Sequence, residues 1–251
     1  MFTPALHHLF HPANIEEYLA SITAGADHLA ATVGRVSGPS SGTTPAQASA
    51  PVARIDLDAP VDGVADALDE LSRVYLDEAI WFHEPTYAAH LNCPVVIPAL
   101  LAELFVSSVN SSLDTFDQSV GGTQIERRLI DWTAARIGLP TSAAPGRPQV
   151  GTRADGIFTS GGTQSNLQAL LLARDTAVAQ HQVEPERLRI LASADGHFSV
   201  QKAAMLLGLS PSAVVQVPCD DAHRMQVEEL GAALQRCRDD DLVPMAVVAT
   251  A

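Results

Sequence analysis

Residues 158–167 read Phe-Thr-Ser-Gly-Gly-Thr-Gln-Ser-Asn-Leu, and they join a short apolar segment to the start of a helix. The preceding segment, 155–158, has the pattern of a brief buried strand. Leu167, Leu170 and Leu171 recur at the spacing of an amphipathic helix. The loop between them is therefore predicted to be a strand-to-helix turn.

The turn itself has the composition of an anion-binding site. Gly161 and Gly162 leave the backbone accessible, and the free N–H groups at a helix start attract anions such as phosphate. Thr163 adds a hydroxyl donor. A tight turn with a helix N-cap explains the same residues, so both interpretations stay open. Because no P-loop lysine and no Gly-x-Gly-x-x-Gly is present, a phosphate bound here would belong to another kind of cofactor.

Composition excludes several classes of function. The chain has 251 residues, of which 47% are hydrophobic and 18% charged, as in ordinary soluble globular proteins. Its net charge of −14 repels nucleic acid, so no nucleic-acid partner is expected. No apolar run reaches the ~18 residues of a membrane span, and no signal peptide is recognisable. We therefore expect a cytoplasmic protein without membrane contact.

The residues that commonly bind metals do not form a recognisable site. The three cysteines are widely spaced, which argues against a disulfide framework or a cysteine metal site and predicts buried thiols: Cys93, Cys219 and Cys237. His7, His8 and His11 lie close together, but no carboxylate or cysteine has ligand spacing with them. An exposed N-terminal segment is the preferred interpretation, and no metal is expected.

The first half of the chain is predicted to be helical. Apolar residues at helical spacing indicate an N-terminal helical arm over 1–33, and the Gly, Ser, Thr, Pro and Ala content of 34–53 predicts a flexible linker. An amphipathic helix is expected to start at Asp62 and to end near Asp77, and a further helix follows Pro98.

Two segments in the middle of the chain have their own patterns. Residues 83–94 are polar and bounded by prolines, which predicts an irregular loop that either contacts a ligand or only connects two elements. Thr123 and Glu126 stand at capping-box spacing and predict a helix start, while Gly138 and Pro140 predict its end. A loop is expected over 141–152.

The last third alternates between apolar segments and helical patterns. Strands are predicted at 188–192, 213–218 and 245–250, and helices from the glycine turn to near Arg174, at 200–207 and at 227–236. This alternation is typical of a parallel sheet covered on both faces. The glycine turn and the segment 195–197 both follow strands, so we expect two ligand loops at one edge of the sheet.

His197 ends the second of these loops. A histidine at this position can stack on a planar ligand while its nitrogens contact a carboxylate. It can equally cap the helix that follows or lie in a polar pocket, and the residues alone leave these alternatives open.

Together these residues resemble a known family. The stretch 158–167, with Ala-Asp-Gly-His-Phe-Ser at 194–199 and Lys-Ala-Ala at 202–204, is similar to the group II pyridoxal-phosphate-dependent decarboxylases. His-Leu-Asn-Cys-Pro at 90–94 and Gly-Gly-Thr-Gln-Ile-Glu at 121–126 resemble the branch of L-2,4-diaminobutyrate decarboxylases. The resemblance runs from about Leu71 to the end.

The resemblance implies an α/β enzyme of fold-type I with pyridoxal 5'-phosphate as cofactor and an amino acid as substrate. Residues 119–251 would form an incomplete cofactor-binding large domain with a mainly parallel sheet, and 54–118 a helical dimerisation segment. A homodimer with active sites at the subunit interface is implied.

The family's roles carry over to particular positions. Gly162 and Thr163 would hold the cofactor phosphate, with Gly161 giving the backbone room. His197 would stack on the pyridine ring and act in catalysis. His90 and Asn92 would border the substrate.

One departure from the family pattern changes the expectation for this chain. In the family the sheet continues to an aspartate and then to the lysine that forms a Schiff base with the cofactor, and both would follow Ala251. Lys202, the one lysine in the sequence, matches a helix position instead. We therefore expect the N-terminal part of a decarboxylase, inactive alone. The alternatives are a non-catalytic truncated or regulatory remnant, or a fold-type I aminotransferase or lyase.

Overall fold

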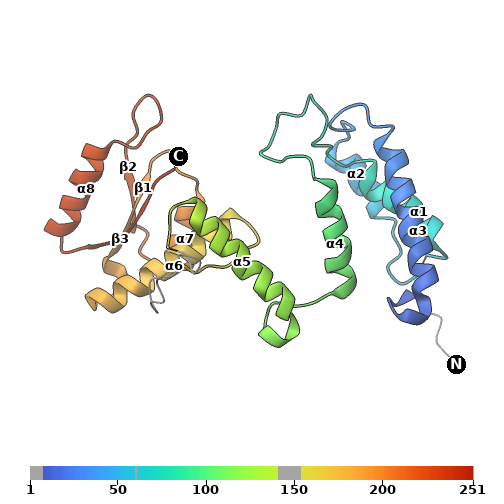
Figure 1. Cartoon of the computed structure of the whole chain (residues 1–251). Helices are drawn as coiled ribbons and strands as arrows, with labels where there is room; N and C mark the ends of the chain where they lie inside the picture. The colour runs from blue at the N-terminus through green and yellow to red at the C-terminus, as the bar shows by residue number, and fades with distance from the viewer. Residues whose placement is uncertain (1–7, 60, 141–153, 251) are drawn as a thin grey trace. The chain divides into compact units, whose positions relative to one another are not determined.

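The computed structural model describes residues 8–59, 61–140 and 154–250. The chain divides into two compact units, Met1–Ser112 and Leu113–Ala251 (Figure 1). His7 and the loop expected over 141–152 lie outside the described residues. None of the described helices is long and apolar enough to cross a bilayer.

Unit 1 consists of helices and loops. Its elements are η2 (Pro12–Asn14), α1 (Ile15–Val33), α2 (Pro45–Val52), α3 (Val64–Leu71), η3 (Ser72–Leu76) and α4 (Ile97–Val109). Polar contacts join α1 to later helices: His28 Nε2 lies 2.5 Å from Ser72 Oγ, and Tyr18 Oη lies 3.5 Å from Ser108 Oγ. Thr32 is the one buried residue in the described part of this unit, so unit 1 has little apolar core of its own.

The expected linker, 34–53, contains a helix. Thr44 caps α2 by accepting a hydrogen bond from the Gln47 backbone, and the Gln47 side chain accepts one from Thr44 in return. This capping box gives a short helix a defined start, although the composition of the segment predicted a linker. The preceding residues are also tied down, because the Trp81 N–H donates to the Pro39 carbonyl at 3.0 Å.

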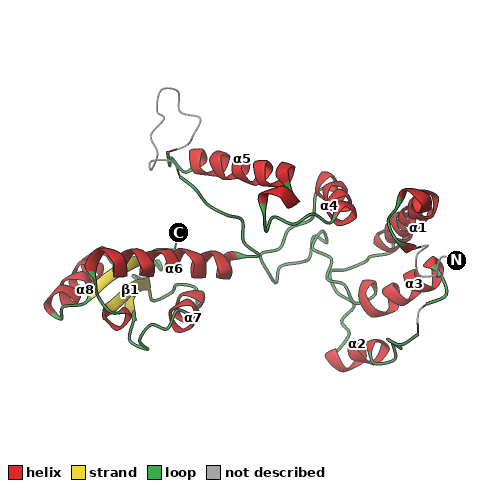
Figure 2. Cartoon of the chain, turned by 90° about the horizontal axis from the view of Figure 1, so that it is seen from below, coloured by secondary structure: helices red, strands yellow, loops and turns green. Residues whose placement is uncertain are grey.

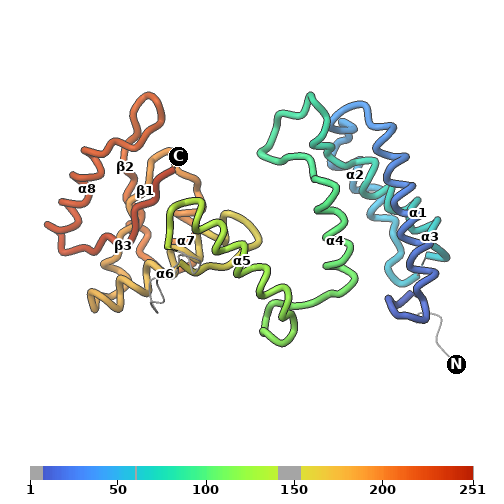
Figure 3. Tube along the Cα trace, in the orientation of Figure 1, coloured from blue at the N-terminus to red at the C-terminus, as the bar shows by residue number. Residues whose placement is uncertain are grey.

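Unit 2 contains the predicted α/β fold. Its elements are η4 (Phe116–Gln118), α5 (Val120–Arg136), α6 (Gly162–His181), η5 (Pro185–Arg187), β1 (Leu188–Ser193), α7 (Ser199–Leu206), β2 (Val214–Val217), α8 (Val227–Asp239) and β3 (Val243–Val248). The strands form a parallel sheet in the order β2-β1-β3, with Ile190 opposite both Val214 and Ala246. The three strands predicted at 188–192, 213–218 and 245–250 and their parallel pairing are confirmed. Figure 3 traces the chain into β3 beside β1.

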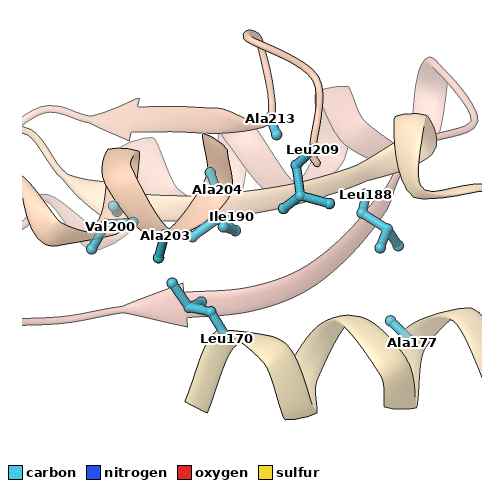
Figure 4. Packing of buried hydrophobic residues seen from close by; sticks show 10 residues of the cluster. Leu170, Ala177, Leu188, Ile190, Val200, Ala203, Ala204, Leu209 and Ala213 are labelled. Carbon is cyan, nitrogen blue, oxygen red and sulfur yellow. The ribbon is translucent and has the colours of Figure 1, made fainter. Parts of the chain in front are cut away.

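Helices cover both faces of this sheet, as Figures 1 and 2 show. On one face Leu170 of α6 packs with Ile190 of β1 and Val200 of α7 (Figure 4). On the other face Leu191 of β1 packs with residues of β2 and with Ala233 of α8. Since β1 is buried from both sides, its residues are mostly apolar and do not alternate strictly with polar ones.

The prediction of a strand at 155–158 is wrong. These residues pair with no strand in the described part of the chain, and Ile157 and Phe158 are 61% and 60% exposed. The Phe158 N–H donates instead to Glu126 Oε1 at 3.0 Å. An apolar segment becomes a strand only where a neighbour supplies hydrogen bonds, and in the described sheet the pairings are those of β1 with β2 and with β3.

Three further expectations differ from the structure. The prediction of a capping box at Thr123 and Glu126 is wrong, because α5 begins one turn earlier and the Thr123 hydroxyl donates to the Ser119 carbonyl. The first helix after the glycine turn does not end near Arg174 but continues to His181, since Ala177 still packs on the sheet. Cys93 is exposed rather than buried.

Candidate active site

The glycine turn is stabilised by its own side chains. Thr159 Oγ1 lies 2.6 Å from Ser165 Oγ and donates to the Gly161 carbonyl at 3.0 Å. The Gln164 side-chain oxygen accepts hydrogen bonds from the backbone N–H and the hydroxyl of Ser160, at 3.0 and 2.6 Å. These bonds fix the entry of the chain into α6 without covering the end of the helix.

The N-terminus of α6 is open. Gly161, its N-cap, gives no side-chain hydrogen bond, and the first turn carries no acidic residue. The first N–H groups of any helix have no partner within the helix, and a 20-residue helix adds its dipole to their partial positive charge. Within the described part of the chain, a Cβ added at Gly161 or Gly162 would meet no atom within 4 Å. Packing of the described residues therefore does not require glycine at these two positions, and none of these residues fills the space beside them.

His197 lies in the loop between β1 and α7, at the carboxyl end of the central strand. Gly196 makes this loop possible, because a Cβ there would lie 2.9 Å from the Ser193 carbonyl oxygen. Phe198 stacks on one face of the imidazole, with ring centroids 4.3 Å apart and an interplanar angle of 30°. Lys202 Nζ lies 4.4 Å from the centroid of the Phe198 ring.

A pair of partly buried hydrogen bonds joins the two loops. Asn166 Nδ2, in the second turn of α6, donates to Ser199 Oγ at 2.8 Å. Ser199 is fully buried, and its hydroxyl lies 2.8 Å from His197 Nδ1. The turn at the start of α6 and His197 therefore share one edge of the sheet, although only the His197 loop follows a strand.

Sequence reasoning did not identify Asn166 and Ser199, although a signal was present. Asn166 stands four residues before Leu170, and Ser199 four residues before Ala203, so each lies on the buried face of its helix. A polar side chain on a buried face requires a hydrogen-bond partner. Two such residues on neighbouring helices indicate that each is the partner of the other.

A third loop meets the His197 loop. His223 Nδ1 lies 2.9 Å from Asp195 Oδ2, and this hydrogen bond holds the pKa of the Asp195 carboxyl below its ordinary value of 3.8. His223 has a positive φ of 61°, so this residue is held in the left-handed region. Cys219 Sγ lies 3.0 Å from Ser193 Oγ, which links the carboxyl ends of β2 and β1.

The remaining predicted site residues belong to unit 1. His90 Nδ1 lies 2.8 Å from the Tyr87 hydroxyl, and the two rings stack with centroids 6.3 Å apart. Asn92 is exposed in the segment that follows. Among the described residues no group of His, Cys, Asp or Glu side chains could hold a metal ion. His8 instead contacts the Glu17 carboxylate, with Nδ1 3.0 Å from Oε1.

The layered parallel sheet with a glycine turn at its carboxyl edge fits the fold-type I pyridoxal-phosphate-dependent class, and comparison with known proteins shows this class. A solved structure, the glutamate decarboxylase domain of diaminobutyrate-pyruvate transaminase and L-2,4-diaminobutyrate decarboxylase from Vibrio parahaemolyticus, matches with a TM-score of 0.85 and 28% identity. The match covers 96% of this chain and 53% of that chain. The pyridoxal-dependent decarboxylase conserved domain matches residues 54–251, and the chain belongs to this family.

Two similar curated proteins are both L-2,4-diaminobutyrate decarboxylases. The L-2,4-diaminobutyrate decarboxylase of Rhizobium meliloti (strain 1021) is 41% identical over 189 residues, which is 75% of this chain and 35% of the relative. The L-2,4-diaminobutyrate decarboxylase of Acinetobacter baumannii is 32% identical over 206 residues, 75% of this chain and 38% of the relative. The chain thus spans little more than a third of the length of these relatives.

Proposed function

We propose that this chain supplies the phosphate-binding turn and the ring-stacking histidine of a pyridoxal-phosphate-dependent amino-acid decarboxylase, a carboxy-lyase. The substrate would be 2,4-diaminobutyrate or a related amino acid, and the products an amine and CO2. The observation that carries the proposal is the hydrogen-bonded path through Asn166 and Ser199, which links the open start of α6 to His197. The names of the two curated relatives support the substrate class.

The residues of this chain fit such a cofactor by their chemistry. The N–H groups of Gly162 and Thr163 bind the phosphate, and the open space beside Gly161 and Gly162 accommodates it. Since Phe198 already covers one face of the His197 ring, the imidazole offers its other face to the pyridine ring. When bound, pyridoxal phosphate supplies an electron-accepting ring that makes loss of CO2 from an amino acid possible.

The protein's part in the reaction is to hold the cofactor and to orient its ring. A phosphate fixed at the helix start positions the ring, and a misplacement of about 1 Å can cost on the order of a hundredfold in rate. The hydroxyl of Thr163 makes no hydrogen bond within the described part of the chain, so it is available to the phosphate. We propose that His90 and Asn92 contact the substrate.

The proposal is tested by binding of pyridoxal phosphate to the purified chain, measured by calorimetry. Thr163→Val removes one hydroxyl at the phosphate site and should weaken binding by about tenfold or more, since a hydrogen bond to a charged group contributes about 1.5–3 kcal/mol. Thr176→Val is the matched control, because Thr176 lies exposed on the same helix. Binding of pyridoxal, which has no phosphate, should be equal in both variants. Equal affinities of both variants for pyridoxal phosphate would contradict the proposed phosphate site.

We also propose that the protein forms homodimers and resides in the cytoplasm. Helix α4 supports the dimer: it is apolar and has no buried residue, with Ile97, Phe105 and Val109 between 61% and 80% exposed. Phe105→Glu should shift the sedimentation of the chain toward monomer, and Leu57→Glu, an exposed leucine outside α4, should not. The three free cysteines are compatible with a reducing compartment.

A further inference from the structure

The hydrogen bonds around Ser199 have a definite direction. The amide nitrogen of Asn166 can only donate, so the bond at 2.8 Å makes Ser199 Oγ the acceptor. The proton of the Ser199 hydroxyl is then free to be donated, and the nearest acceptor is His197 Nδ1 at 2.8 Å. The backbone N–H of Ser199 also donates to His197 Nδ1, at 3.2 Å.

A ring nitrogen that accepts two hydrogen bonds carries no hydrogen of its own. A neutral imidazole has one N–H group, and with Nδ1 occupied as an acceptor that group must be at Nε2. His197 is exposed, and Nε2 makes no hydrogen bond within the described part of the chain. The free side of the ring therefore presents a donor.

We propose that Ser199 and Asn166 are positioning residues that hold neutral His197 in its Nε2–H tautomer, so that the ring presents a hydrogen-bond donor to an anionic group of the ligand. The part of this inference that concerns the ligand rests on the proposed function, and the carboxylate of an amino acid is the anion that function supplies. Asn166 lies less than one helical turn after Thr163, so the same helix binds the phosphate and orients the imidazole.

Burial explains why the arrangement is stable. Ser199 is 0% exposed, so its hydroxyl must find hydrogen-bond partners inside the protein in every rotamer. Asn166 and His197 are the partners present, and a hydrogen on Nδ1 would bring an N–H of His197 against the N–H of Ser199. Such a contact leaves a donor without an acceptor at a buried position, which is unfavourable.

The tautomer can be measured without cofactor or turnover. Long-range proton–nitrogen NMR correlations of the labelled 251-residue chain, recorded above the pH at which histidine is protonated, distinguish an N–H nitrogen from an acceptor nitrogen. The signals of His197 are assigned by their loss in His197→Gln. We expect Nε2–H in the wild-type chain, and the Nδ1–H tautomer there would overturn the inference.

Two variants test the roles of the positioning residues. Ser199→Ala removes one of the two donors to Nδ1, and the ratio of Nδ1–H to Nε2–H should rise about fivefold, equivalent to ~1 kcal/mol for one hydrogen bond. Asn166→Asp is nearly isosteric, but its carboxylate only accepts, so the Ser199 hydroxyl should turn toward it and the ratio should rise in the same direction. A residue that only fills space would show no such change in Asn166→Asp.

The controls separate this inference from the proposed function. Ser212→Ala removes an exposed hydroxyl of the turn before β2 and should leave the tautomer unchanged. An unchanged ratio in both Ser199→Ala and Asn166→Asp would overturn the inference while leaving phosphate binding at Thr163 intact. The expected tautomers in a chain that shows no Thr163-dependent binding of pyridoxal phosphate would overturn the proposed function instead.

Discussion

Truncation of Leu170 to alanine should loosen the attachment of α6 to the sheet. Leu170 is 4% exposed and packs in the cluster that contains Ile190 and Val200. Burial of a leucine side chain contributes about 1.5–3 kcal/mol, and the cavity left by its removal adds to the loss. Because the sheet has only three strands and its surroundings can partly collapse, we expect about 2–4 kcal/mol, the lower part of the range for such substitutions.

The assay is hydrogen exchange of the β1 amides, read from the peptide that covers Leu188–Ser193. These amides lie in the central strand and exchange only when the core of unit 2 opens. A loss of about 2–4 kcal/mol corresponds to exchange faster by about thirtyfold to about a thousandfold. Measuring one strand avoids assuming that the two units unfold together.

Leu172→Ala provides the matched control, because Leu172 lies on the same helix and is 59% exposed. Its truncation should change the opening free energy by less than about 0.5 kcal/mol, as for most surface substitutions. If the two variants accelerated exchange of β1 equally, the packing of α6 through Leu170 would be refuted. A larger effect for Leu172 would show that the opposite face of α6 is the packed one.

Three further substitutions have defined outcomes. Gly196→Ala should cost about 1–3 kcal/mol in the same exchange assay, because its Cβ would lie 2.9 Å from the Ser193 carbonyl oxygen. Asp195→Asn removes the carboxylate whose contact with His223 keeps the pKa of Asp195 below 3.8. The stabilisation of the folded wild-type chain by this contact is therefore present above about pH 4 and disappears as the pH falls through the lowered pKa. In denaturant titrations the free energies of unfolding of the wild-type and variant chains should converge toward acid pH. Gln182→Gly should raise the free energy of unfolding by about 0.5–1 kcal/mol, measured by denaturation, because Gln182 ends α6 with a φ of 52°.

Each of these predictions has a direct check. Gly161→Ala, at a position with open space around it, should cost less stability than Gly196→Ala. Asp221→Asn, in the same loop as His223, should not reproduce the pH dependence of Asp195→Asn. A destabilised Gln182→Gly would show that the Gln182 side chain contributes more than its backbone strain costs.

The sheet was predictable because its strands are mainly apolar segments separated by helical patterns. Leu188–Ser193, buried on both faces, has few polar residues to interrupt the pattern, and Gly208 marks the end of α7 with a φ of 70°. The parallel pairing then follows from the helices between the strands. Local sequence was sufficient here because local pattern and tertiary packing agree.

The sequence predictions were wrong where tertiary contacts determine the local structure. Ile157 and Phe158 have strand propensity, but no strand in the described part of the chain pairs with them. Thr123 and Glu126 have the spacing of a capping box, yet the helix begins at Val120 and Glu126 binds the Phe158 backbone instead. Spacing alone does not show which of two turns starts a helix.

In the candidate site, sequence patterns identified the loops but not the bonds between them. The turn at Gly161 and Gly162 and the position of His197 after a strand were visible in the sequence. Asn166 and Ser199 were not assigned, because their roles depend on the contact of α6 with α7. The fold makes that contact, and sequence spacing does not encode it directly.

The hydrogen bond between Asn166 and Ser199 closes a loop of modest length, since the two residues are 33 positions apart. Loop-closure entropy grows only with the logarithm of loop length, and contacts at short sequence separation form early in folding. The contact between α6 and α7 can therefore form soon after Leu206 has left the ribosome, before β2 and β3 have emerged from it. A growing chain would then acquire the orientation of its imidazole before most of the sheet exists.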